Sequence, residues 1–90
     1  MSMRFPTITG RVSITEEEGK VVIGGDPEGL RSLGKLLTWL GDQDVEQWPY
    51  LKPGGHAHIH LYPKDDMLEG SRQVELVRLD AKGEGELVDK

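Results

Sequence analysis

Three histidines alternate with apolar residues in one short stretch, and they are the side chains whose type and spacing most readily suggest chemistry. The stretch reads GGHAHIHLYP and contains all three histidines of the 90-residue chain. Side chains two residues apart in a β-strand point to the same face. The pattern therefore predicts a strand with imidazoles on one face, His56, His58 and His60, and aliphatic side chains on the other, Ala57, Ile59 and Leu61.

Metal binding is the first chemistry that this row allows. A His-x-His pair on a strand can converge on one zinc ion, with Zn–N distances of about 2.0–2.1 Å. Three histidines in a row span too far for easy convergence, so the zinc alternative uses His56 and His58. A third ligand would come from a neighbouring strand, where Glu75 or Asp80 could serve. Our main prediction is that the protein has no metal or other cofactor.

Nucleotide hydrolysis is the second possibility. The pattern His-x-His-x-His followed by two apolar residues resembles the motif of the histidine-triad nucleotide hydrolases, in which the middle histidine attacks phosphorus. By that resemblance His58 would be the nucleophile, supported by His56 and His60. The upstream strands and nucleotide pocket of that domain have no counterpart in this sequence. We therefore favour a protein without catalytic residues.

Docking of another protein is the third possibility, because exposed imidazoles on an open sheet face need no further group. Two tryptophans and a tyrosine are further candidates for a surface that docks another protein. Trp39 lies outside the leucine stripe of a predicted helix, where it either anchors a partner or folds over the edge of the sheet. Trp48 and Tyr50 belong to a proline-containing loop that is either a binding surface or a flap over the core. The predicted partner-binding set is Trp39, Trp48, Tyr50, His56, His58 and His60.

The elements that position these residues are one helix and four strands. Asp26 as N-cap and Pro27 at the first helical position predict a helix over residues 27–40. Its leucines fall on one face, and we expect the following residues to be buried together: Leu30, Leu33, Leu37, Ile59 and Leu61.

The predicted strands cover residues 8–15, 20–25, 56–62 and 72–80. The order strand–strand–helix–strand–strand predicts an α+β two-layer sandwich, with one helix packed on a four-stranded, mostly antiparallel sheet. In the last strand the apolar residues change parity, which indicates either two covered faces or a β-bulge. We expect residues 1–80 to form one domain and residues 81–90 to form a frayed polar tail.

The composition limits the kinds of partner and the cellular compartment that we expect for this protein. The chain has a formal net charge of −5 and no cysteine. An acidic surface disfavours nucleic acid and suits a basic protein partner. The chain has neither a signal peptide pattern nor an apolar run long enough to cross a bilayer. We expect a cytoplasmic protein that binds neither nucleic acid nor membrane, and its oligomeric state is left open.

Three segments in succession resemble a known family. They are GDPEGLRSLGKLLTWL, PGGHAHIHLYP and LEGSRQVELVRLD. Together they are similar to the bacterial immunity protein 32 family, over roughly residues 21–80. The resemblance implies a non-catalytic protein that neutralises a cognate toxin, delivered between competing bacteria, by binding it directly. The additional His60 and the long loop before the histidine strand depart from the family pattern, so the surface that contacts the toxin can differ.

Overall fold

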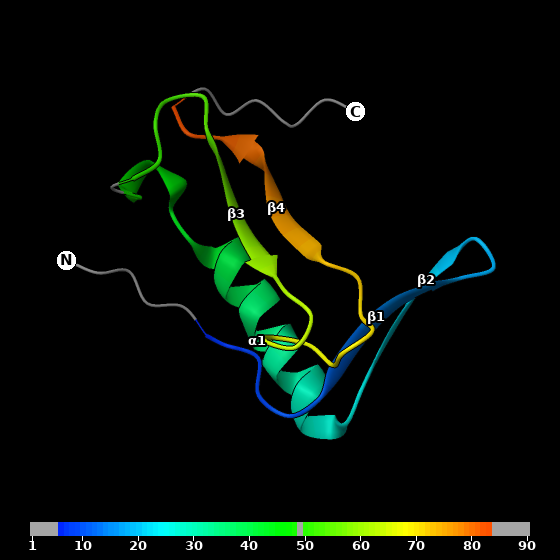
Figure 1. Cartoon of the computed structure of the whole chain (residues 1–90). Helices are drawn as coiled ribbons and strands as arrows, with labels where there is room; N and C mark the ends of the chain where they lie inside the picture. The colour runs from blue at the N-terminus through cyan, green and yellow to red at the C-terminus, as the bar shows by residue number, and fades with distance from the viewer. Residues whose placement is uncertain (1–5, 49, 84–90) are drawn as a thin grey trace.

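The chain folds into two β-hairpins joined through one α-helix, as the computed structural model shows (Figure 1). The structure describes residues 6–48 and 50–83. In chain order the elements are β1 (Val12–Glu17), β2 (Lys20–Gly25), α1 (Pro27–Asp42), the short 3-10 helix η1 (Val45–Gln47), β3 (His56–Leu61) and β4 (Val74–Ala81). This confirms the predicted α+β class and the ββαββ order.

The start of α1 follows from its capping residue. The Asp26 carboxylate accepts a hydrogen bond of 2.6 Å from the Gly29 backbone N–H, which would otherwise lack a partner in the first turn. The same carboxylate accepts a bond of 3.0 Å from the Arg11 backbone N–H. These two bonds hold the pKa of Asp26 below its usual value, the bond from Arg11 contributing most. Asp26 thus begins the helix and ties it to the segment before β1.

Gly29 is required by a close approach of backbone segments. A Cβ atom built on Gly29 would lie 1.9 Å from the Arg11 carbonyl oxygen, far inside van der Waals contact. Gly34, one turn further along α1, has nothing within 4 Å of such a Cβ atom. Gly29 and Gly34 therefore differ in their role, because only Gly29 lets the backbone at Arg11, just before β1, pass directly over the helix.

The core lies between α1 and both hairpins. Its buried apolar residues are Val12, Ile14, Leu33, Leu36, Leu40, Val45, Ala57, Ile59, Leu61 and Met67. The predicted burial of Leu33, Ile59 and Leu61 is confirmed. The predicted burial of Leu30 and Leu37 is wrong, since these side chains are 46% and 47% exposed.

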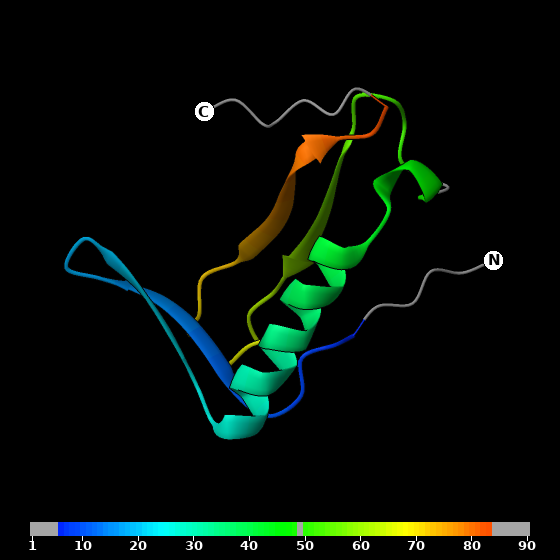
Figure 2. The same cartoon turned by 180° about the vertical axis from the view of Figure 1, so that it is seen from behind.

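The shift in the buried helix face has a physical reason. The leucine stripe spans more of the helix circumference than the neighbouring elements cover, and the face that meets them is centred on Leu33, Leu36 and Leu40. The β1–β2 hairpin starts beside the N-terminal end of α1 and projects away from the helix (Figures 1 and 2). Its β2 strand is left largely uncovered, and Val21 is 65% exposed.

The predicted four-stranded sheet is wrong, because the strands form two separate two-stranded antiparallel sheets, β1–β2 and β3–β4. The second edge of β1 is occupied by the segment that leads into β4. Leu68 N–H donates to the Val12 carbonyl at 2.8 Å, and Arg72 N–H donates to the Ile14 carbonyl at 2.8 Å. Between them the buried Ser71 hydroxyl accepts from Ile14 N–H at 3.3 Å. The segment Leu68–Arg72, attached to β1 by backbone bonds and by the Ser71 hydroxyl, thus takes the place where β4 would pair with β1.

The β3–β4 hairpin carries the histidines. Ala57, Ile59 and Leu61 are buried toward α1, whereas His58 and His60 are exposed on the opposite face, which confirms the predicted parity. The register shifts between His56 and His58. The change of parity in β4 falls between Leu76 and Val77, where the pairing with Ile59 and His58 is regular, so this shift does not account for it.

The C-terminal boundary lies slightly beyond the prediction. Lys82 N–H donates to the Gly55 carbonyl and Gly54 N–H donates to the Lys82 carbonyl, both at 2.8 Å. The ordered pairing therefore continues past residue 80. The rest of the predicted tail, residues 84–90, lies outside the described residues. No helix within the described ranges has the length and apolar character needed to cross a membrane.

Candidate functional site

The open face of the β3–β4 sheet brings two histidines and a carboxylate together. His60 on β3 lies directly opposite Glu75 on β4, and His58 lies opposite Val77. The His60 Nε2 atom is 3.9 Å from a Glu75 carboxylate oxygen. One ligand-capable atom from each of His58, His60 and Glu75 lies within 4.8 Å of the others.

Ring contacts orient these imidazoles. The His58 and His60 rings meet edge to face with centroids 5.1 Å apart. Tyr62 stacks on the other side of His60, with centroids 6.0 Å apart. The His58 Nδ1–H group donates to the His56 carbonyl at 3.1 Å, since a carbonyl oxygen can only accept. That hydrogen bond leaves the Nε2 atom of His58 available as an acceptor or ligand.

His56 is placed differently from the other two histidines. The register shift separates it from their regular alternation, and its side chain is half-buried. Its Nδ1–H group donates to the Asp80 carbonyl at 3.0 Å. His56 does not belong to the described group of side chains that could share an ion, so the predicted His56–His58 metal pair is not the one that the fold brings together.

The loop before β3 lies against the histidine strand and forms an open pocket with it. The pocket has a volume of about 180 Å³ and is lined by Trp48, Tyr50, Leu51, His56 and His58. We call these five residues the aromatic–histidine surface. Four of them belong to the predicted partner-binding set. Tyr50 is 81% exposed, the most exposed large side chain among the described apolar and aromatic residues.

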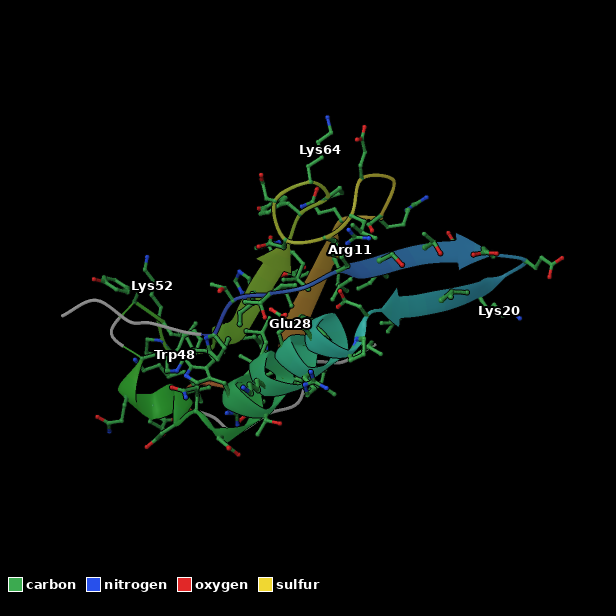
Figure 3. All side chains as sticks on the ribbon, turned by 90° about the horizontal axis from the view of Figure 1, so that it is seen from below. Arg11, Lys20, Glu28, Trp48, Lys52 and Lys64 are labelled. Carbon is green, nitrogen blue, oxygen red and sulfur yellow. The ribbon has the colours of Figure 1, made fainter. Side chains whose placement is uncertain are left out.

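The loop is held to the hairpin by Lys82 and Gly83, which directly follow β4. The Lys82 ammonium donates to the Trp48 carbonyl at 2.7 Å. Gly83 N–H donates to the Glu46 carboxylate at 2.5 Å, and Asp44 caps η1 by accepting from Glu46 N–H at 3.0 Å. These bonds fasten the part of the loop that precedes Tyr50 to the hairpin. Trp48 and Lys52 lie at the end of the molecule opposite Lys20, which marks the tip of the β1–β2 hairpin (Figure 3).

The two tryptophans pack against each other. Their ring centroids are 5.9 Å apart with an angle of 46° between the planes. Both are half-buried and contact the core cluster. The Trp48 Nε1 atom is buried and has no hydrogen-bond partner within the described part of the chain. Trp39 therefore supports the loop from the helix, while Tyr50 presents its ring to solvent.

A charge network behind the surface was not predicted. Arg78 forms two hydrogen bonds to the Asp80 carboxylate, of 2.9 and 2.6 Å. Its remaining nitrogen donates to the carbonyls of Leu40 and Gln43 at the end of α1. The guanidinium of Arg78 holds the pKa of Asp80 below its usual value. Asp80, one of two suggested metal ligands, is thus engaged elsewhere, and Glu75 is the one beside the histidines.

The geometry defines the class of protein: a small α+β domain whose most distinctive surface combines exposed aromatic and imidazole side chains. Comparison with known families gives the assignment. The model of the family described as Immunity protein 32 matches residues 20–79. The chain therefore belongs to the Immunity protein 32 family, which confirms the resemblance seen in the sequence. No curated protein and no solved structure matches the chain.

Proposed function

We propose that this protein neutralises a cognate bacterial toxin by binding it directly, without catalysis, and that the toxin docks on the aromatic–histidine surface. Membership of the Immunity protein 32 family carries the proposal of toxin neutralisation. The proposal of a docking surface rests on Tyr50. An aromatic ring left 81% exposed on a loop does not contribute to the core, and aromatic residues are the usual anchors of protein interfaces.

The anchoring of the loop supports this choice. A loop that is already held in place loses less conformational entropy when a partner binds, so more of the contact energy appears as affinity. The bonds from Lys82 to Trp48 and from Gly83 to Glu46 fix the loop before Tyr50, and the bond from Gly54 N–H to the Lys82 carbonyl fixes it after Tyr50.

Charge near the loop supports a basic toxin. Asp42, Asp44 and Glu46 are exposed in the segment that precedes Trp48. Acidic residues at the rim of an aromatic patch attract a basic partner and speed its association. The formal net charge of −5 points the same way. We propose that the encounter takes place in the cytoplasm, in line with the absence of cysteine.

Co-expression with the toxin encoded beside this gene tests the proposal. We expect the wild-type chain to restore growth and to co-purify with the toxin. Tyr50→Ala should weaken both effects, whereas Val21→Ala should preserve them, because Val21 is an exposed apolar residue on the opposite hairpin. Absence of protection and of a complex with the wild-type chain would contradict toxin neutralisation. Equal loss in the two variants would contradict the assigned surface.

A further inference from the structure

We propose that His58, His60 and Glu75 form a binding site for one divalent transition-metal ion of the zinc class on the open face of the β3–β4 sheet. Two imidazoles and one carboxylate are a ligand set that zinc accepts with a fourth position left open. The three side chains come from two adjacent strands, and the backbone register places His60 directly opposite Glu75. This inference does not depend on the proposed function.

The distances allow the site to close without movement of the backbone. The three ligand-capable atoms lie within 4.8 Å of one another. Neighbouring ligands of a tetrahedral zinc ion are about 3.3 Å apart, given metal–ligand bonds of about 2.0–2.1 Å. Small side-chain rotations bring the atoms from one spacing to the other. All three side chains are exposed, so they are free to make that adjustment and water can reach the ion.

The groups behind the ligands favour metal binding. Metal-bound histidines usually donate their second ring N–H to a carbonyl or carboxylate, which fixes the ring and directs the other nitrogen to the ion. His58 makes this bond to the His56 carbonyl at 3.1 Å, so its Nε2 atom is the one left for a metal. Tyr62 stacks on the His60 ring and restricts its orientation.

The chemistry of the ligand set selects the ion. Imidazole nitrogen suits zinc, copper and nickel, whereas magnesium and calcium prefer oxygen ligands alone. With neutral imidazoles the set carries a single negative charge from Glu75, which favours a cation. The remaining coordination position can be filled by water or by a ligand atom from a docked molecule.

Isothermal titration of the untagged full chain with zinc chloride tests the site. We expect one ion to bind per chain, and magnesium chloride to give no binding. His58→Ala, His60→Ala and Glu75→Gln should each weaken zinc binding by about 100-fold or more, since even the loss of a group behind a metal ligand costs about 10–100-fold. His56→Gln is the matched control and should retain most of the affinity, because His56 is outside the group.

A spectroscopic measurement makes the test independent of binding heats. Cobalt(II) in place of zinc should give the intense visible absorption of a four-coordinate site, and the three ligand variants should lose it. Circular dichroism verifies that each variant is folded. Absence of zinc binding to the folded wild-type chain would overturn the proposal. So would zinc binding that survives all three ligand substitutions or that depends equally on His56.

Discussion

Arg78 and Asp80 form a two-point ion pair on β4, and the same guanidinium donates to backbone carbonyls at the end of α1. The last carbonyls of a helix have no partner within the helix, so a cation at that position satisfies them and interacts favourably with the helix dipole. Both side chains are half-buried in this contact, with exposures of 21% and 31%. The pair thus connects the helix to the hairpin that carries the histidines.

Arg78→Ala should lower the free energy of unfolding by about 1–3 kcal/mol, because it removes charge-assisted hydrogen bonds and leaves Asp80 unpaired. Chemical denaturation followed by circular dichroism measures this. Arg72→Ala, at an exposed arginine near the start of the same strand, is the control and should change stability much less. Equal effects in the two variants would show that Arg78 contributes no more than a surface charge.

Gly29 and Gly34, both in α1, should respond in opposite directions to alanine. Gly29→Ala should destabilise the fold by about 1–3 kcal/mol, because the new Cβ atom meets the Arg11 backbone and forces it to move. Gly34→Ala should stabilise it by about 0.5–1 kcal/mol, because its surroundings are open and alanine favours the helix. Thermal unfolding of both variants checks the signs. Stabilisation by Gly29→Ala would mean that the close approach of the Arg11 backbone to the helix is not maintained in solution.

Acid should weaken the fold through Asp26 and Asp80. Both carboxyl groups have a pKa lowered by folding from an ordinary value of 3.8. A group of this kind stabilises the folded state fully above its unfolded pKa, and the contribution is lost as the pH falls through the folded pKa. We therefore expect stability to decline progressively below about pH 4. Denaturation curves between pH 7 and pH 2.5 measure the decline, and Asp80→Asn should flatten it. If the stability of Asp80→Asn depended on pH in the same way as that of the wild type, the role of Asp80 would be contradicted.

We expect no hydrolysis of nucleoside phosphoramidates or dinucleoside polyphosphates. The histidine row resembles the histidine-triad hydrolases only over residues 56–62, and the family assignment of the chain is a different one. Product formation from such substrates, measured by chromatography, is the check. Turnover by the wild type that disappears in His58→Ala, a substitution at the residue that would be the nucleophile, would contradict a purely binding function.

Local patterns predicted much of this fold. Asp26 followed by Pro27 marks the start of α1, and the alternation of Ala57, Ile59 and Leu61 assigns the buried face of β3 correctly. These features depend on residues close together in the sequence, where capping and strand periodicity act directly. The tertiary arrangement could not be predicted from such local patterns. Nothing local to Ser71 indicates that its segment occupies the edge of β1 and keeps the two hairpins in separate sheets.

In the candidate site, too, some features follow from the local sequence and others depend on the tertiary fold. The exposure of His58 and His60 was predictable from parity alone. That Glu75, rather than Asp80, lies beside them depends on the strand register, which pairs His60 with Glu75. The ion pair with Arg78 that engages Asp80 likewise requires the folded hairpin. Tyr50 lines one pocket with His56 and His58 only in the folded chain, where Lys82 and Gly83 bind the preceding residues Trp48 and Glu46.

The affinity of the purified chain for its cognate toxin, measured for Tyr50→Ala beside Val21→Ala, tests the central claim most directly. Truncating an interface anchor usually costs about 2–4 kcal/mol of binding free energy. We predict a loss of that size for Tyr50→Ala, little change for Val21→Ala, and unchanged unfolding curves for both. Wild-type affinity in the folded Tyr50→Ala variant would contradict docking on the aromatic–histidine surface.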